Sequence, residues 1–376
     1  MTSRIVQGVL AGAAIGAAAV AIAELNRPLG GETELLDWTE VSDLARARLG
    51  GERVPPRYLA EVSEELNRLA TEVTPPLLDA VGGLPEGRTL ARFEALDRVQ
   101  WLERNVASMR SMVEPMLKAN RMPRTRLTDA GKAGVDRYMA FLLDLLARRV
   151  LGQFDPQLGA TRAAPPGSES LYLVEQNVAA WQERAKVDGA DLRRWLILHE
   201  LTHAWQFAAH PWLREHLNSA LEKLLDSVGA RNGSPMTVDR LFRLTIGAPE
   251  QWAVIRQVQA TMTLVEGYGN LLMNLVGRRI LPTFDQLEAA YEERSGSRSL
   301  VDLLVWRFTG LEVKMQQYKV GEAFCQRIHD IYGMETLNLA WVGPENLPRP
   351  GELRDPERWY RRVAGPRFRL VDASEG

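Results

Sequence analysis

Cysteine is nearly absent from this chain, because Cys325 is the only one among its 376 residues. A disulfide bond within the chain is therefore excluded, and with it a small disulfide-stapled scaffold of the secreted type. Zinc sites built from several cysteines are excluded for the same reason. An excess of charge is also lacking, since the formal net charge is −2. Such a balance gives no indication of a nucleic-acid partner.

Histidine is scarce as well, with five residues in the whole chain. Two of them stand four apart in the run DLRRWLILHELTHAWQF, where His199 and His203 form an H-E-x-x-H motif around Glu200. The run contains no proline and no glycine, and its apolar residues favour a helix. Because histidine is scarce, this motif is less expected by chance than it would be in a histidine-rich chain.

The H-E-x-x-H motif predicts a metal centre. In a helix, residues four apart lie on the same face, so the two imidazoles can converge on one zinc ion at about 2.0–2.1 Å. Glu200 is then placed to act as a general base, taking a proton from a water molecule bound to the zinc. The alternative is a buried helix in which His199 and His203 are core residues, each of which would still need a polar partner.

A catalytic zinc site needs a third protein ligand and an open position for water. The best candidate is Glu266, a lone carboxylate in the otherwise uncharged stretch 257–277. An ionised carboxylate is costly to bury without a partner, and a metal ion would supply one. Gly267 and Gly269 beside it allow another backbone or a substrate to approach closely.

Other assignments remain open for the third ligand. Glu266 could instead cap a helix or pair with Arg278 or Arg279. His210 and His329 are alternative ligands, although the proline after His210 is expected to end its helix there.

The motifs resemble those of a known family. The segments that carry the resemblance are Asp37-Trp38, Asn105 to Ser108, Arg149 to Pro156, Leu171 to Val178, HELTHAWQF, Pro211 to Arg214, Val265 to Gly267, Lys314 to Tyr318 with Gly321, Trp341, and Pro344 to Pro348. With these segments the chain resembles the zincin-like family of zinc-dependent metallopeptidases, found largely in actinobacteria and related bacteria. Some members are linked to biosynthesis of a deazaflavin coenzyme. The resemblance extends from about residue 37 to near residue 360.

The resemblance implies a site as well as a fold. It implies that His199, His203 and Glu266 bind one zinc ion and that Glu200 is the general base. One position departs from the family pattern, because Tyr268 stands two residues after Glu266, where many members have His. A histidine that supports the zinc ligands is therefore not expected at that position.

The N-terminal segment differs in composition from the rest of the chain. Residues 5–23 carry no charge, and this length is close to that needed to cross the hydrocarbon core of a bilayer. Gly8, Gly12 and Gly16 have a spacing that lets helices approach closely in a membrane. A membrane anchor, a secretory signal and a helix packed on the domain are the three interpretations. We predict membrane association through this helix; the family resemblance favours the alternative, a soluble cytoplasmic enzyme.

The fold predicted for the remainder is mainly α, or α+β with a small strand element, in a zincin-like metallopeptidase domain over residues 34–376. Residues 1–33 are expected to form the hydrophobic segment and a linker, which covers residues 26–32. Leu171 to Val174 is the one convincing strand signal. By analogy with zincins, we assign this strand to the sheet edge that holds the substrate.

Three further expectations concern local structure. Pro75-Pro76 is expected to break the chain. The apolar spacing over residues 91–114 predicts a long amphipathic helix. Residues 347–368 are expected to pack as an irregular tail.

The predicted function is hydrolysis of peptide or amide bonds by a zinc-dependent metallopeptidase, with a peptide or amide substrate as its partner. Tyr318 or His329 could stabilise the oxyanion, although packing or solvated roles are the alternative for each. Two other functions remain: a non-catalytic zinc-containing binding or assembly protein, and a zinc hydrolase of small amides. Retention of Glu200 argues against the first of these, because a structural zinc site needs no base.

Overall fold

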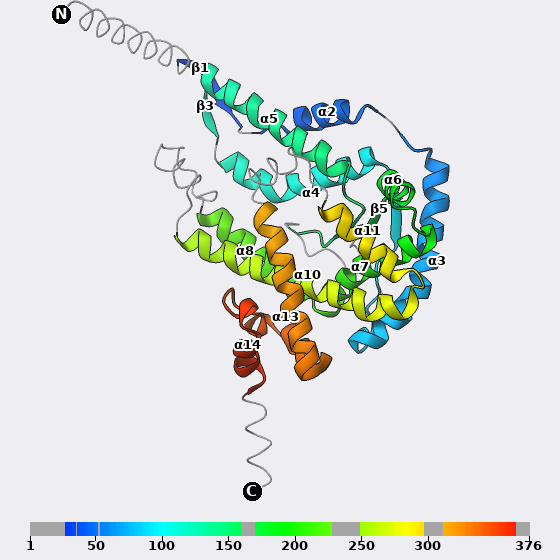
Figure 1. The fold of residues 1–376 in the computed structure, drawn as a ribbon. Helices are drawn as coiled ribbons and strands as arrows, with labels where there is room; N and C mark the ends of the chain where they lie inside the picture. Colours follow the sequence, from blue (N-terminus) through cyan, green and yellow to red (C-terminus); the bar gives the residue numbers. More distant parts are fainter. Residues whose placement is uncertain are drawn as a thin grey trace, which may run out of the picture.

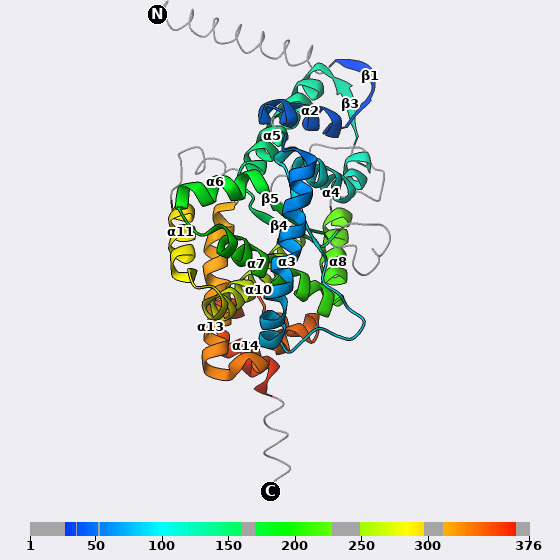
Figure 2. The same ribbon diagram turned by 90° about the vertical axis from the view of Figure 1, so that its right-hand side faces the viewer.

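The computed structural model describes residues 27–34, 36–51, 53–119, 121–158, 170–227, 249–296 and 311–365. Within these ranges the chain is mainly helical, with two small sheets (Figures 1 and 2). The predicted fold class is therefore confirmed. At one end of the molecule lie β1, β3 and α2, and at the opposite end lies α14, while α13 runs from the middle of the molecule toward α14.

The helices have the following bounds: α2 Trp38–Leu49, α3 Pro56–Val81, α4 Arg98–Ala119, α5 Arg126–Ala147, α6 Glu175–Ala185, α7 Gly189–Ala209, α8 Trp212–Ser227, α10 Pro249–Ile280, α11 Phe284–Gly296, α13 Leu311–Asn338 and α14 Pro356–Val363. The strands are β1 Pro28–Thr33, β2 Phe93–Leu96, β3 Met122–Thr125, β4 Gly152–Asp155 and β5 Ser170–Val174. Short 3-10 turns connect α13 to α14.

A three-stranded sheet divides the molecule into two cores. Its strand order is β2-β5-β4, with β2 parallel and β4 antiparallel to β5. Leu171 and Leu173 of β5 face the larger core, while Tyr172 and Val174 face the smaller one. The larger core joins α3, α7, α10 and α13, and the smaller one joins α2, α4 and α5. Both faces of β5 are therefore covered, which explains its uninterrupted apolar sequence.

The strand predicted at Leu171–Val174 is confirmed as β5, but its assignment to the sheet edge is wrong. β5 is the central strand, and β4 lies at the edge. β4 was not recognised in the sequence because its four residues, GQFD, carry no alternation of polar and apolar side chains.

The helix predicted over residues 91–114 is only partly correct, because Phe93–Leu96 form β2 and α4 begins at Arg98. The side chain of Asn67 in α3 bonds to both the N–H and the C=O of Phe93, at 3.0 and 2.8 Å. The carboxylate of Asp97 accepts a bond from the N–H of Gln100, as a helix N-cap does. The apolar spacing fits either conformation, and these tertiary and capping contacts select the strand.

The predicted break at Pro75-Pro76 is also wrong, because both prolines lie inside α3. Val73, Leu77 and Val81 are buried on one face of this helix, on either side of the proline pair. Their burial against the larger core offsets the lost backbone hydrogen bonds.

Two terminal expectations need revision. Residues 28–33, which lie largely in the predicted linker, form β1 and pair antiparallel with β3. The predicted irregular tail contains α14, whose Trp359 is fully buried.

The hydrophobic stretch 5–23 lies outside the described residues, so its membrane association stays a prediction. Among the described helices, none combines the length and the apolar character that crossing a bilayer requires.

Candidate metal centre

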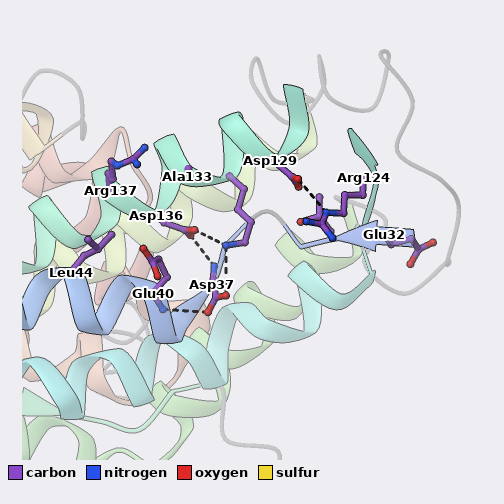
Figure 3. Close-up of a pocket in the computed structure, with 11 residues that line it drawn as sticks. Glu32, Asp37, Glu40, Leu44, Arg124, Asp129, Ala133, Asp136 and Arg137 are labelled. Carbon is purple, nitrogen blue, oxygen red and sulfur yellow. Dashed lines mark hydrogen bonds and ion pairs between the residues drawn. The ribbon is translucent and has the colours of Figure 1, made fainter. Parts of the chain in front are cut away.

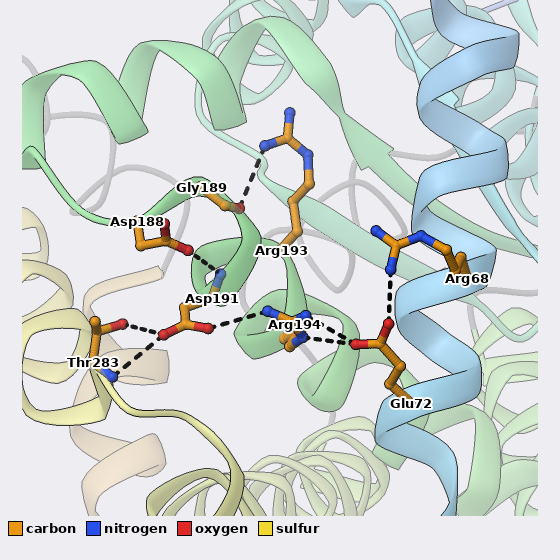
Figure 4. Close-up of polar contacts among 8 residues, drawn as sticks. All are labelled: Arg68, Glu72, Asp188, Gly189, Asp191, Arg193, Arg194 and Thr283. Atoms are coloured by element: carbon orange, nitrogen blue, oxygen red, sulfur yellow. Dashed lines mark hydrogen bonds and ion pairs between the residues drawn. The ribbon is translucent and has the colours of Figure 1, made fainter.

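The helix α7 contains the H-E-x-x-H motif and is buried on nearly all sides. Its N-cap is Asp188, whose side chain accepts a bond from the N–H of Asp191. The Asp191 carboxylate accepts a bond from the Thr283 hydroxyl at 2.7 Å and pairs with Arg194, which also pairs with Glu72 of α3 (Figure 4). These contacts tie the first turns of α7 to α3 and to the start of α11. They fix the helix that carries the two histidines.

The structure brings the three candidate ligands together. His199 and His203 of α7 and Glu266 of α10 each direct a ligand atom into one group, and these atoms all lie within 4.8 Å of one another. The two Nε2 atoms are 3.2 Å apart. The Glu266 carboxylate lies 3.6 Å from Nε2 of His203 and 3.9 Å from that of His199. Side chains from two helices that are distant in sequence thus form one cluster.

The donor set fits a zinc ion. Tetrahedral ligands at zinc-to-nitrogen distances of about 2.0–2.1 Å are separated by about 3.3 Å, close to the spacing of the two imidazole nitrogens. Two imidazoles and one carboxylate also match the three protein ligands of a catalytic zinc site. The side chains of His199 and Glu266 are 25% and 24% exposed, so the group opens to solvent on one side. A fourth ligand therefore has access to it.

The predicted general base lies beside this group. Glu200 is 6% exposed, and its carboxylate faces β4, where the backbone N–H of Phe154 donates a hydrogen bond to it. A Cβ atom added at Gly152 would lie 2.7 Å from Oε1 of Glu200. Glycine at this position in β4 is what allows the carboxylate to approach the strand.

The pKa values of His199, Glu200 and His203 are shifted by burial and by the charge of the Glu266 carboxylate. Burial raises the pKa of Glu200 to about 7, and the charge of Glu266 acts in the same direction. Burial and the neighbouring His203 lower the pKa of His199 to about 4. Burial also opposes the charged form of His203, but Glu266 outweighs it and raises the pKa of that imidazole to about 9. The negative charge of Glu266 thus favours a positive charge within the group.

In both His199 and His203, Nε2 faces the cluster of candidate ligands, and Nδ1 on the other side of the ring contacts a further side chain. Nδ1 of His203 lies 2.9 Å from Oε1 of Gln206, and Nε2 of Gln206 donates to the carbonyl oxygen of Val265 at 3.0 Å. Nδ1 of His199 lies 3.0 Å from the sulfur of Met273. The sequence motifs do not predict the contacts of Gln206, Met273 or the β4 backbone. The only available signal was the position of Gln206, three residues after His203 and hence on the same helix face.

The alternative third ligands do not join the cluster in the described part of the chain. His210 ends α7 and stacks on Trp341, with ring centroids 5.7 Å apart. His329 contacts the carboxylate of Asp330 at 3.1 Å. Arg278, considered as a partner of Glu266, pairs with Asp285 and Glu288 instead.

The structure describes the side chain of Tyr268 but not that of Tyr318. Tyr268 is fully buried, stacks on Trp205 and donates its hydroxyl to Oδ1 of Asn338 at 2.7 Å. It supports the helix packing rather than the metal group. The side chain of Tyr318 lies outside the described residues, so its role in oxyanion stabilisation stays a prediction.

The described residues also form a pocket of about 390 Å³ between β1, α2 and α5, close to β3 (Figure 3). No histidine lines it. Its Lys132 lies 2.7 Å from Asp136 and 3.6 Å from Asp37, while Arg124 pairs with Asp129. The lining carries five carboxylates (Glu32, Asp37, Glu40, Asp129 and Asp136) and three basic side chains (Arg124, Lys132 and Arg137), and the ion pairs among them hold the elements together. The pocket shares no residue with the group formed by His199, His203 and Glu266.

Comparisons with known proteins bear on this geometry. No curated protein matches the chain. A solved structure from Chloroflexus aurantiacus, described as "a putative hydrolase with a novel fold", is 33% identical with a TM-score of 0.65, and the match covers 87% of this chain and 98% of that one. Residues 36–360 match the model of a family described as zincin-like metallopeptidase, with the three-ligand group and Glu200 inside the matched range. The chain therefore belongs to the zincin-like metallopeptidase family.

Proposed function

We propose that this protein is a zinc-dependent metallopeptidase that hydrolyses peptide or amide bonds at the His199, His203 and Glu266 group. The observation that carries the proposal is the position of Glu200. Its carboxylate lies between the histidine helix and the edge strand β4, beside a three-ligand group that opens to solvent. A purely structural zinc site is closed and has no need of a base at this position.

Zinc bound by the three ligands would act as a Lewis acid, activating water and polarising the carbonyl of the scissile bond. Glu200 accepts the proton of the attacking water and passes it to the leaving amine. The backbone hydrogen bond from Phe154 favours the ionised, proton-accepting form of Glu200. Gln206 and Met273 contact the outer nitrogens of the histidine rings, which leaves both Nε2 atoms directed at the group.

The edge strand supports a peptide rather than a small amide as substrate. β4 pairs with β5 along one side, and the N–H of Phe154 is directed at Glu200. An extended peptide that adds to a sheet edge is held by main-chain hydrogen bonds. Such a peptide at β4 would bring its backbone next to Glu200. The description of the relative from Chloroflexus aurantiacus as a hydrolase agrees with this reaction class.

The test combines metal content with activity. Purified parent protein is expected to contain about one zinc ion per chain, and His199→Ala and Glu266→Ala to contain little. Glu200→Gln is expected to retain its zinc and to lose about 100- to 10,000-fold in hydrolysis of a peptide library. If the library is untouched but small amides are cleaved, the small-amide hydrolase replaces the peptidase. If zinc binds and neither the parent nor Glu200→Gln cleaves any substrate, the protein is a binding or assembly protein instead.

A further inference from the structure

The side-chain amide of Gln206 connects the two helices that supply the ligands. Gln206 is fully buried in α7, one turn beyond His203. Its Oε1 lies 2.9 Å from Nδ1 of His203, and its Nε2 donates to the carbonyl oxygen of Val265 at 3.0 Å. Val265 directly precedes Glu266 in α10. One side chain thus contacts a histidine ligand and the backbone next to the carboxylate ligand.

The chemistry of the amide fixes its orientation. The Val265 carbonyl can only accept a hydrogen bond, so the NH₂ end of Gln206 must face it. The carbonyl oxygen of the amide is then directed at His203, and this oxygen can only accept. Nδ1 of His203 must therefore carry the proton. In a neutral imidazole, the lone pair then resides on Nε2, the atom that faces His199 and Glu266.

The other histidine has no comparable support. Nδ1 of His199 faces the thioether sulfur of Met273, which is a weak acceptor. Met273 also lies in α10, so this contact joins the same two helices, but a thioether constrains the ring less than an amide oxygen does. The two outer contacts of the site are therefore unequal.

We propose that Gln206 is a positioning residue that prepares the centre for metal binding by fixing the tautomer of His203 and the spacing of α7 and α10. This inference rests on the proposed function, since it concerns the same three ligands. Outer partners of metal-binding histidines hold the ring orientation, and their loss weakens metal affinity. Gln206 differs from a single-ligand partner because it constrains two ligands through one amide.

The first test measures zinc affinity by competition with a chromophoric chelator. Gln206→Leu removes both hydrogen bonds, and its dissociation constant for zinc is expected to rise about 10- to 100-fold. The visible absorption of the cobalt-substituted protein is expected to change as well, because the His203 ring is no longer held at a fixed angle. Neither readout depends on turnover of a substrate.

Gln206→Glu separates positioning from simple tethering of the helices. A carboxylate still accepts the proton of His203 Nδ1, but it cannot donate to the Val265 carbonyl. Zinc affinity in Gln206→Glu is expected to fall less than in Gln206→Leu, because the contact that fixes the His203 tautomer is kept and only the contact that spaces α7 and α10 is lost. Thermal unfolding of the same variant is expected at a lower temperature, since the contact with α10 is lost.

Thr202→Val is the matched control. Thr202 is fully buried in the same helix, and its hydroxyl donates to the carbonyl oxygen of Leu198, within α7 itself. Its zinc affinity should equal that of the parent. If Gln206→Leu binds zinc as the parent does, or if Gln206→Glu weakens binding as much as Gln206→Leu, the positioning role is refuted while the metal site stands. If the parent binds no zinc, the proposed function and this inference both fail.

Discussion

The carboxylate of Glu200 and the backbone of Gly152 are in such close contact that no side chain fits between them. A Cβ atom at Gly152 would lie 2.7 Å from Oε1 of Glu200 and 2.8 Å from Cδ2 of Leu173. The strand β4 and the helix α7 therefore meet at Glu200, the proposed general base. The position of β4 therefore affects the position of the Glu200 carboxylate beside the candidate metal ligands.

Gly152→Ala is expected to reduce kcat for a peptide substrate by about 10- to 100-fold, because the added methyl group displaces the base by a fraction of an ångström or more. Zinc content should stay at the parent value, since the atoms nearest to the added methyl group belong to Glu200 and Leu173. Gly134→Ala is the control, because nothing lies within 4 Å of a Cβ at that glycine. Unchanged kcat in Gly152→Ala would show that Glu200 is not held by β4.

Gly267→Ala is expected to lower the free energy of unfolding by about 1–3 kcal/mol through overpacking. Its Cβ would collide with the backbone of Gly321, so α10 and α13 would have to separate. Zinc affinity should fall in parallel, because Glu266 is the adjacent residue. Urea denaturation and chelator competition measure the two effects. Gly131→Ala, in an open stretch of α5, is expected to raise stability by about 0.5–1 kcal/mol.

Met273→Leu is expected to change the zinc dissociation constant by less than about threefold, because a thioether is a weak hydrogen-bond acceptor and leucine has a similar volume. Comparing this variant with Gln206→Leu in the same chelator assay tests whether the contact of Gln206 with His203 contributes more to zinc affinity than the contact of Met273 with His199 does. A tenfold loss in Met273→Leu would instead show that the sulfur orients His199.

The pH dependence of stability is expected to include a contribution from His210. Burial lowers the pKa of this imidazole to about 4 in the folded protein, and its Nε2 is buried without a partner. The unfolded chain binds the proton near pH 6.5, so it binds more protons than the folded state between pH 6.5 and about 4. The free energy of unfolding should therefore decrease across this window as pH falls, with no contribution from His210 above it.

His210→Phe should remove that contribution while preserving ring contacts with Trp205 and Trp341. Urea denaturation at pH 7.5, 6 and 5 measures it as the difference between variant and parent. His329→Gln is the control, since it leaves His210 in place and should follow the parent. Parallel curves for His210→Phe and the parent would contradict the assignment.

The candidate ligands and the candidate base are local features of the sequence. His199 and His203 are recognisable because a helix repeats every 3.6 residues and places positions four apart on one face, and Glu200 follows the first of them directly. Glu266 is recognisable because a lone carboxylate in an apolar stretch needs a partner. The spacing of the two histidines and the isolation of the carboxylate are both local properties of the chain, so they can be read without knowledge of the fold.

The surroundings of these candidate ligands depend on tertiary packing. The conformation of residues 93–96 depends on Asn67, which is 26 residues away, and helix α3 continues through Pro75 and Pro76 because its apolar face is buried. The edge position of β4, the approach of Gly152 to Glu200 and the bond from Gln206 to Val265 join segments that are distant in sequence. Such contacts depend on how elements pack, and a pattern of residues along one element does not specify them.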